Sequence, residues 1–471
     1  VRALLFDVQG RHVPGIEGRE ATVTRTTPDG GVEIDPEDLV VRAAKAVDAA
    51  LAAAGGRPIA AVGSCTFWHS VLGVDAAGDP VTPVYTWADM RGDARRALGE
   101  KLDERAFHAR TGCLFHASYP PAKILWVAQT RPDVFRRAAR WMSFGEFLFS
   151  RLFGRAVCTV SMASGAGLLD IHQRRFDAPI LAALGLREDQ LWPLGDVGQT
   201  LQGLREPYAS RWPALKDVPW CPPVGDGGCN SLGSGCSTSN RIAVMLGTSG
   251  ALRASWKAER VEIPWGLFCY LANRERVVMG GALSNGGNLV EWVRGAYRLG
   301  APEEVEREIA AMAPDAHGLT FLPFLAGERS PGWTPDARGM LLGLRLATRP
   351  IDILRAGLEA VAIQFGLLHD LVVKAVPAAR EVVASGGGFV NSPAWAQILA
   401  DVLNRPVALS AEPEASSRGA ALLAMEALGW IRSAEDLPAA LGKTFAPDAG
   451  RHAAYRAAAE RHARRYRELV Q

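Results

Sequence analysis

The sequence predicts an α/β fold with more than one domain, and two observations lead to this expectation. Short apolar, strand-like runs alternate along the chain with longer segments of helical periodicity, which is typical of an α/β architecture. The 471 residues also exceed what one hydrophobic core usually serves, so two to four domains are expected.

Composition argues against several classes of protein. The formal net charge is +2 and 22% of residues are charged. The chain therefore lacks the large excess of basic residues that is typical of nucleic-acid-binding proteins. No run reaches about 18 uncharged apolar residues, and we expect no membrane span. The seven cysteines form no C-x-x-C pair, which favours free thiols in a reducing compartment over disulfides or a zinc site. The chain opens on a strand-like run with no signal peptide, so a cytoplasmic location is expected.

The first 34 residues predict a β-meander. The apolar strand Val1–Phe6 leads into a turn at Asp7–Gly10. The alternating run Glu20–Arg25 predicts the next strand, and Asp29–Gly31 predicts another turn.

A helix is predicted over Asp38–Ala54, because Asp35 followed by Pro36 is a typical helix start. Strands are then predicted at Ile59–Gly63 and near Val71–Val74, with long helical stretches up to about residue 160.

In the second half, the strand-like run Ile242–Leu246 ends in the turn Gly247–Gly250. The pattern that follows predicts strands at Ala251–Trp256, Gly266–Leu271, Val277–Met279 and Glu381–Ala384, and helices from Asn288 and over 303–313, 350–375, 392–403 and 452–470.

The most informative feature is an aspartate between glycines, Asp226, about twenty residues before that turn. A Gly-Thr-Ser-Gly turn after a strand presents backbone N–H groups and two hydroxyls, which can bind phosphate oxygens. A carboxylate nearby could take the proton of an attacking hydroxyl, so the pair suggests phosphoryl transfer. The structural alternatives are a helix N-cap at Asp226 and an ordinary hairpin turn at Gly247–Gly250.

Two long, spaced patterns carry a family resemblance. The run Ser118–Trp126 (SYPPAKILW) and the pattern from Gly339 to Glu359 match the two signatures of the FGGY carbohydrate kinases, except at Gly357, where a larger residue is usual. The chain therefore resembles this family of the actin-like ATPase superfamily over essentially its whole length. The resemblance implies two actin-like (ribonuclease H-like) domains with an active-site cleft between them: 1–232, which binds the sugar, and 233–471, which binds the nucleotide.

Within the family, the gluconokinase branch is the most similar. Thr82–Arg91 (TPVYTWADMR) looks like that branch's T-P-x-x-T-W-A-D-x-R, and Trp68-His69-Ser70 looks like its M-H-S. Phe321–Pro331 also follows this branch. Xylulokinases share the general frame but usually differ in the tryptophan–aspartate segment, so they come second.

The resemblance implies roles for individual residues. Asp226 matches the catalytic base, which also contacts the sugar, and lies near the water shell of a Mg²⁺ ion. ATP is the implied phosphoryl donor, and its binding residues match Gly247, Thr248, Ser249, Gly287, Gly386, Gly387 and Asn391.

Candidate sugar-binding residues in the first domain are Trp68, His69, Trp87, Asp89 and His116. Indole faces and short polar groups suit a polyol acid, which needs an apolar wall and directional hydrogen bonds. As structural alternatives, Trp87 could be a core residue, and Asp89 could form an ion pair with Arg91.

The family opens with a strand and an Asp-x-Gly-Thr-Ser phosphate loop before the strand that corresponds to Val1–Phe6. We expect this N-terminal strand and first phosphate loop to be missing here, because no such motif precedes Val1. We also expect the gene product to start upstream, because the chain begins with Val and not Met and because ALRASW, which follows the Gly247–Gly250 turn, resembles the opening VRALLFD. An in-frame Gly-x-Asp-x-Gly-Thr upstream would support this, and an extended chain should then turn over faster.

The leading hypothesis is an ATP- and Mg²⁺-dependent kinase of a small sugar or sugar acid, gluconate first. The alternatives are a xylulokinase or another pentulose kinase, and a non-catalytic actin-like sugar-binding protein. The oligomeric state, a homodimer included, and the hydroxyl phosphorylated stay open.

Overall fold

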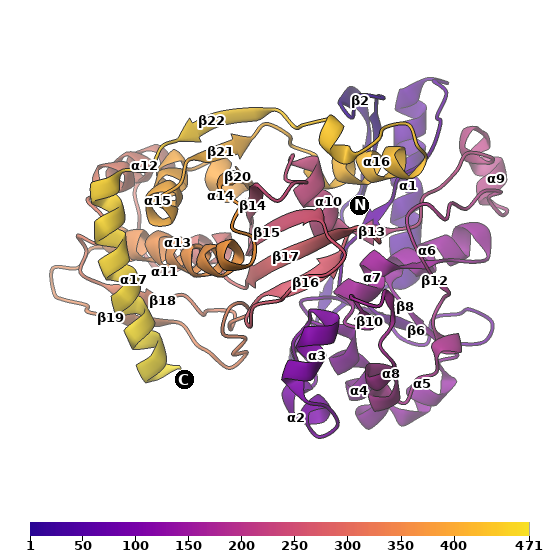
Figure 1. Cartoon of the computed structure of the whole chain (residues 1–471), viewed down its shortest axis with the longest axis horizontal. Coiled ribbons are helices and arrows are strands. Elements are labelled where there is room, and N and C mark those ends of the chain that lie inside the picture. The colour runs from indigo at the N-terminus through magenta and orange to yellow at the C-terminus, as the bar shows by residue number, and fades with distance from the viewer. Residues whose placement is uncertain (471) are drawn as a thin grey trace.

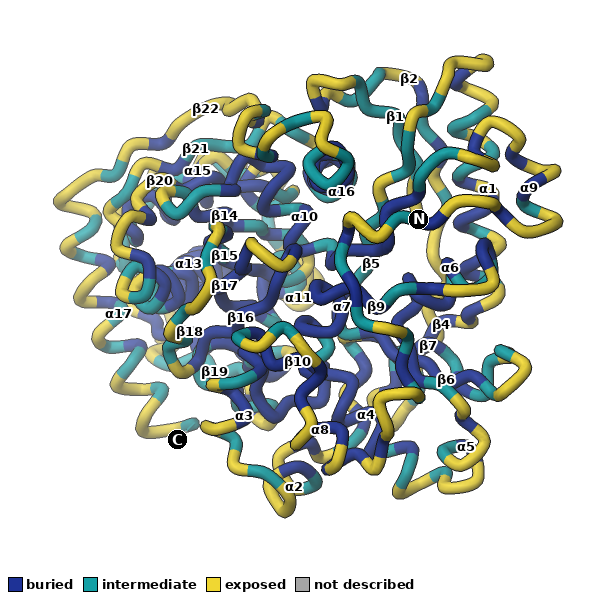
Figure 2. The backbone as a smooth tube through the Cα atoms, turned by 45° about the vertical axis from the view of Figure 1, so that its right-hand side comes forward, coloured by how far each residue is buried: buried dark blue, intermediate teal, exposed yellow. Residues whose placement is uncertain are grey.

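The computed structural model describes residues 1–470, which form two lobes side by side (Figure 1). The first lobe contains the N-terminal half of the chain, and the second contains a large sheet with its covering helices. One hydrophobic cluster joins them, since it includes Trp68 and Tyr119 of the first lobe and Leu252 and Phe268 of the second. Figure 2 shows this buried backbone in the middle of the molecule, with exposed segments around the outside.

The second lobe is built on a seven-stranded sheet. Three neighbouring strands run parallel to one another, and the remaining neighbours pair antiparallel. In spatial order the strands are β16 (Phe268–Leu271), β17 (Arg276–Leu283), β15 (Gly250–Lys257), β14 (Arg241–Leu246), β20 (Glu381–Ser385), β21 (Val407–Ser410) and β22 (Leu441–Phe445), of which β14, β20 and β21 are the parallel ones. In this order the antiparallel strands β14, β15 and β17 are neighbours, and the parallel strands β20 and β21 follow on the other side of β14, as expected for an actin-like domain.

Helix α13 (Pro350–Ala375) lies against β15 and β17 and forms the core of this lobe. Within residues 1–470 it is the one helix long and apolar enough to cross a membrane, but 72% of its apolar stretch is buried inside the protein. The other helices and strands of this lobe are α11 (Gly287–Ala296), α12 (Pro302–Ala311), α14 (Gly387–Val390), α15 (Pro393–Leu403), α16 (Ala415–Ala427), α17 (Ala449–Leu469), β18 (Thr320–Leu322) and β19 (Met340–Leu342).

The strands described in the first lobe form only small sheets of two or three strands. They are β1 (Arg2–Phe6) with β2 (His12–Arg19), β3 (Arg25–Thr26) with β4 (Val32–Ile34) and β7 (Val84–Tyr85), β6 (Leu72–Val74) with β8 (Arg140–Met142), β5 (Cys65–Thr66) with β13 (Val224–Gly225), β9 (Cys158–Thr159) with β12 (Leu194–Gly195), and β10 (Leu169–Asp170) with β11 (Arg175–Phe176).

The helices of the first lobe begin with α1 (Pro36–Ala54), where Asp35 caps the N-terminus by accepting the Asp38 N–H at 2.9 Å, as the sequence predicts. The others are α2 (Ala94–Gly99), α3 (Glu104–Thr111), α4 (Pro120–Thr130), α5 (Pro132–Arg137), α6 (Phe144–Phe153), α7 (Val160–Gly165), α8 (Ala178–Leu184), α9 (Tyr208–Arg211) and α10 (Asp226–Gly233).

Two predicted strands of this lobe are wrong. The strand that pairs with β1 follows the Asp7–Gly10 turn directly as β2, and not at Glu20–Arg25. The sequence did not predict this strand because Pro14 and Gly15 are unfavourable in most strands, although proline is tolerated at a sheet edge. Ile59–Gly63 contributes only an isolated bridge between Val62 and Trp220, and the paired strand comes later, as β5.

Helices α10 and α16 fasten the two halves of the chain together. They approach so closely that a Cβ at Gly233 or Gly419 would overlap the backbone of the other helix. Arg418 of α16 donates to the Gly10 and Gly233 carbonyls at 2.8 Å each, and α16 reaches the first lobe in Figure 1. The boundary predicted between 232 and 233 falls at the end of α10 and stays a prediction.

Candidate active site

The residues predicted to bind ATP meet at one edge of the large sheet. Strands β14 and β20 run parallel, with Met245 beside Ser385, so the turn after β14 and the turn after β20 emerge together. In the first turn, Gly247 donates to the Ser249 carbonyl at 3.0 Å. Within residues 1–470, the N–H groups and hydroxyls of Thr248 and Ser249 have no hydrogen-bond partner. This turn therefore offers unpaired donors, as a phosphate-binding turn requires.

Gly386 brings the second turn against the first. It has φ +90° and ψ 156°, a conformation that is essentially restricted to glycine. A Cβ there would overlap the Leu246 carbonyl group, whose carbon would lie 2.8 Å away. Gly387 and exposed Asn391 follow at the two ends of the short helix α14.

Helix α11 completes this end of the site. Gly287 donates to the Gly247 carbonyl at 2.8 Å, and Asn288 donates to the Thr248 carbonyl at 3.1 Å. The predicted residues of the hairpin, of α11 and of the Gly386 turn thus surround one place, although their contacts to a nucleotide remain predictions.

Asp226 is the first residue of α10, directly after β13. The N-cap position belongs to Gly225, so the N-cap alternative for Asp226 is wrong. Its Oδ1 accepts the N–H groups of Gly227 at 2.8 Å and Trp68 at 3.4 Å, while Oδ2 accepts no hydrogen bond within residues 1–470. Burial raises the pKa of Asp226 above its ordinary value of 3.8, and the charge of Arg253 opposes this rise.

Arg253 lies beside this aspartate, and sequence reasoning missed it. It comes from the middle of β15, and its guanidinium reaches the backbone of Gly227. Its buried Nε has no hydrogen-bond partner, and burial lowers the pKa of the guanidinium while Asp226 raises it. The sequence does offer a signal for this residue, since Arg253 is a charged residue in the middle of the strand GALRASWK.

Aromatic side chains form a wall next to Asp226. Trp68 packs on Gly225 and Gly227, and its Nε1 donates to the Ser161 carbonyl at 3.0 Å. Tyr270 of β16 lies edge-on to Trp68 at 4.9 Å between ring centroids, and its hydroxyl bonds that of Tyr119 at 2.6 Å. Trp68 thus supports the Asp226 loop from beneath.

Both histidines proposed as sugar ligands are neutral. His69 has a left-handed backbone, and its Nδ1 bonds the Gly165 carbonyl. His116 Nδ1 lies 2.8 Å from the Ser118 hydroxyl. Burial lowers the pKa of each to about 3, and the nearby charge of Arg329 adds to this effect. Neutral imidazoles suit hydrogen bonds with sugar hydroxyls.

The two candidates from the Thr82–Arg91 segment differ in exposure. Trp87 is 41% exposed, which does not fit a core residue, and the Arg329 guanidinium lies 5.5 Å from the centre of its ring. Asp89 is 1% exposed, and it accepts Arg91 at 2.6 Å and the Val32 N–H at 3.0 Å. This geometry favours the ion-pair alternative for Asp89.

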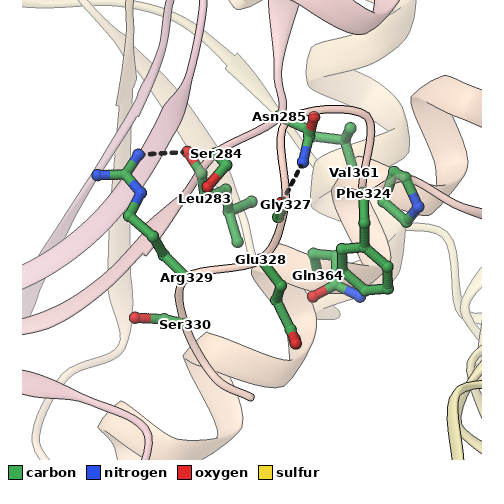
Figure 3. Close-up of a pocket in the computed structure, with 11 residues that line it drawn as sticks. Leu283, Ser284, Asn285, Phe324, Gly327, Glu328, Arg329, Ser330, Val361 and Gln364 are labelled. Carbon is green, nitrogen blue, oxygen red and sulfur yellow. Dashed lines mark hydrogen bonds between the residues drawn. The ribbon is translucent and has the colours of Figure 1, made fainter. Parts of the chain in front are cut away.

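Figure 3 shows a small pocket under the Phe321–Pro331 segment. Asn285 donates to the Gly327 carbonyl at 3.0 Å and Arg329 donates to the Leu283 carbonyl at 2.7 Å, and both bonds hold this segment to β17 and the residues after it. Glu328 and Arg329 point to opposite sides of the segment.

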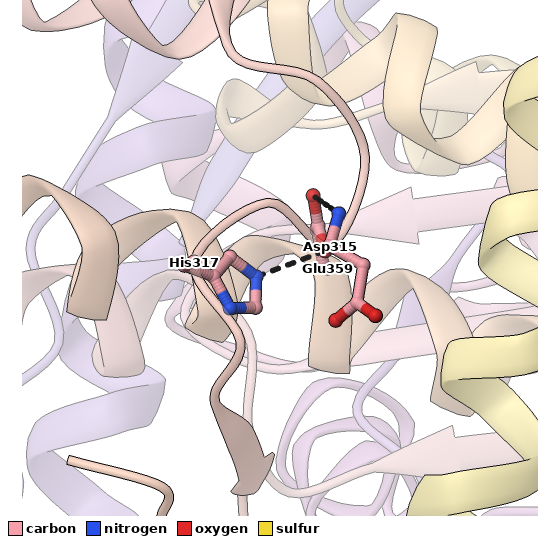
Figure 4. A group of neighbouring side chains, drawn as sticks. All are labelled: Asp315, His317 and Glu359. Carbon is pink, nitrogen blue, oxygen red and sulfur yellow. Dashed lines mark hydrogen bonds and ion pairs between the residues drawn. The ribbon is translucent and has the colours of Figure 1, made fainter. Parts of the chain in front are cut away.

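A second cluster, Asp315, His317 and Glu359, has the composition of a metal site (Figure 4). Its carboxylates already have cationic partners: Glu359 accepts Arg355 at 2.6 Å, and Asp315 accepts both outer nitrogens of Arg461. Because Arg355 lies on α13 and Arg461 on α17, the cluster fastens these helices, and its donors do not fit a metal ion.

Comparisons with known proteins identify the family. Models of the N-terminal and C-terminal domains of the FGGY family of carbohydrate kinases match residues 1–233 and 242–428. A gluconokinase of Bacillus subtilis (strain 168) is 30% identical over 389 residues, which cover 80% of this chain and 76% of that protein. The chain belongs to the FGGY family of carbohydrate kinases. It is therefore an ATP-dependent carbohydrate kinase, and ATP and a sugar are its substrates.

Other relatives of this FGGY kinase carry different names. A xylulose kinase of Escherichia coli (strain K12) is 28% identical over 484 residues, covering 100% of this chain and 97% of that protein. Solved structures of a xylulose kinase and a gluconate kinase, both from Lactobacillus acidophilus, superpose with TM-scores of 0.92 and 0.91 at 24% identity each. They cover 100% and 99% of this chain, and 96% and 95% of their own chains. These likenesses confirm the two-domain actin-like fold.

Proposed function

We propose that this kinase phosphorylates a hydroxyl of a sugar acid, with gluconate as the first candidate. The observation that carries this proposal is the charge of the cleft. Arg329 is desolvated there and has no carboxylate within 4.0 Å among residues 1–470, whereas Arg253 interacts with the charge of Asp226. A buried cation without a partner is costly, so a site of this kind favours an anionic ligand.

The chemistry follows from the placement of the side chains. Asp226 Oδ2 is available to accept the proton of the sugar hydroxyl, while Oδ1 is held by backbone N–H groups. The turn with Thr248 and Ser249 would bind phosphate oxygens of ATP. Arg253, next to Asp226, would offset the negative charge of the transferred phosphoryl group.

A Mg²⁺ ion fits this arrangement. The cation prefers carboxylate oxygens, waters and nucleotide phosphates, and it usually keeps several waters. Asp226 Oδ2 would hold one of those waters, so Asp226 would interact with the ion through water and not as a direct ligand. When bound with ATP, Mg²⁺ would neutralise charge on the nucleotide phosphates.

A xylulokinase is the second candidate, since the likeness to xylulose kinases extends over the whole chain. The cationic cleft argues for the sugar acid, because xylulose carries no charge. The substrate-binding roles of Trp68, His69, Trp87 and His116 suit either candidate.

An ADP-release assay with gluconate, xylulose, ribulose and glycerol tests this proposal. The assay uses the wild type, with Asp226→Asn as the inactive control. We expect gluconate to give a kcat/KM at least about tenfold above that of the neutral sugars, which corresponds to about 1.4 kcal/mol. A preference for xylulose or ribulose would refute the sugar-acid proposal in favour of a pentulose kinase.

A further inference from the structure

Residues of both lobes contact Arg329. One of its outer nitrogens, Nη2, donates to the Leu283 carbonyl at the end of β17, at 2.7 Å. From the first lobe, Trp87 lies under the guanidinium, 5.5 Å from its central carbon. A guanidinium carries five N–H donors, and this one uses a single donor within residues 1–470. The remaining donors lie in one fixed plane and have no hydrogen-bond partner among the described residues.

The neighbouring residue Glu328 carries the carboxylate closest to Arg329 in the sequence, but this carboxylate binds other groups. Glu328 accepts the Tyr466 hydroxyl at 2.5 Å and the Gly332 N–H at 3.2 Å. Figure 3 shows its side chain directed toward Gln364, away from Arg329. Arg329 therefore carries a positive charge that no neighbouring carboxylate neutralises at salt-bridge distance among the described residues.

The two cations of the cleft have different surroundings. Arg253 acts on Asp226, because its charge is the leading influence that lowers the pKa of that carboxyl group. No carboxylate acts on Arg329 in this way: the Tyr119 and Tyr270 hydroxyls lie near it, Tyr270 also lies near Arg253, and burial lowers the pKa of Arg329 to about 10. If Asp226 is the base, Arg253 would lie at the reacting hydroxyl, and Arg329 would contact another part of the substrate.

We propose that Arg329 is the specificity-determining residue that binds the carboxylate of the sugar acid, with Trp87 holding the guanidinium in its plane. This inference rests on the proposed function and names the side chain that would recognise the carboxylate of the substrate. A guanidinium suits this task because it binds a carboxylate with two parallel N–H bonds. Trp87 belongs to the Thr82–Arg91 segment that resembles the gluconokinase branch, so both halves of this subsite come from segments with that likeness.

The test compares gluconate with gluconamide, in which a neutral amide replaces the carboxylate, and adds pentonates of the same class. Arg329→Gln removes the charge, and Arg329→Lys keeps the charge without the planar donors. Arg105→Gln is the matched control, since it removes an exposed arginine that also stacks on a tryptophan, Trp265, with 4.6 Å to the ring centre. Thermal unfolding of each variant checks the fold.

We expect Arg329→Gln to lower kcat/KM for gluconate by about 30- to 5,000-fold through KM, the range for losing one partner of a desolvated charge pair. The value for gluconamide should change less than about threefold, Arg329→Lys should recover part of the loss, and Arg105→Gln should match the wild type. Equal losses for the acid and the amide, or an unchanged KM for the acid, would overturn the role of Arg329.

Failure of the proposed function gives a different pattern. If the wild type uses a pentonate but not gluconate, and Arg329→Gln abolishes that preference, gluconate is refuted and Arg329 is supported. If quenching of tryptophan fluorescence shows that the wild type binds no sugar acid, both proposals fall.

Discussion

Replacing Gly386 by alanine should separate the two turns that form the predicted nucleotide site. The backbone conformation there costs a residue with a side chain about 1–3 kcal/mol. The added Cβ would also overlap the Leu246 carbonyl group, and overpacking of this kind costs about 1–3 kcal/mol more. The sum is about 2–6 kcal/mol, which lowers the melting temperature of a domain of this size by roughly 4–24 °C.

Gly387→Ala is the matched control. A Cβ at Gly387 would meet only the Asn391 side-chain nitrogen at 3.4 Å, and φ there is not positive. Differential scanning fluorimetry should therefore show a large shift for Gly386→Ala and a shift below about 3 °C for Gly387→Ala. The KM for ATP should rise in Gly386→Ala. Equal melting temperatures for the two variants, or a Gly386→Ala variant with wild-type stability and KM, would refute this account of the site.

Two other variants test the cleft. Arg253→Gln should lower kcat by about 10²–10³-fold. It should also move the acid limb of the kcat/KM profile to higher pH: the carboxylate form of Asp226 is the active one, and without the arginine its pKa, already raised by burial, rises further. An acid limb that stays in place or moves to lower pH would contradict the pairing with Asp226. Asp89→Asn should destabilise the protein by about 1–3 kcal/mol with little change in KM, because Asp89 is buried against Arg91, which retains Glu33 at 2.7 Å. A tenfold higher KM for the sugar at unchanged melting temperature would instead support substrate binding by Asp89.

Elements with local signals could be predicted from the sequence. The start of α1 follows from Asp35 and Pro36, and the hairpin at Gly247–Gly250 follows from its glycines. Strand β2 was missed because Pro14 and Gly15 conceal it, while pairing with β1 stabilises it in the fold. The error at Ile59–Gly63 has the same origin: pairing partners from distant parts of the chain decide which apolar run becomes a strand.

The residues of the site also fall into two groups: those that a local motif predicts and those that only the three-dimensional fold identifies. Asp226 and the glycine turns lie within short motifs, and the fold brings the two turns together at one edge of the large sheet and places Asp226 beside Arg253 of β15. Arg253 and Tyr270 were missed because neither lies in a local motif, and Arg329 was missed because the Phe321–Pro331 segment does not by itself show which of its residues reaches the site. Their significance comes from burial without a partner and from contacts with residues more than a hundred positions away, such as Trp68 with Tyr270.

The most direct test of the central claim is gluconate-dependent ADP release by the wild type and by Asp226→Asn. Both proteins should first be shown to have the same melting temperature, so that a difference in turnover does not reflect unfolding. We predict turnover by the wild type that requires gluconate, and a kcat at least about 10²-fold lower in the variant with KM for gluconate within about threefold. Equal turnover by the two proteins would contradict the assignment of Asp226 as the base, and wild-type turnover that gluconate does not stimulate would contradict the proposed substrate.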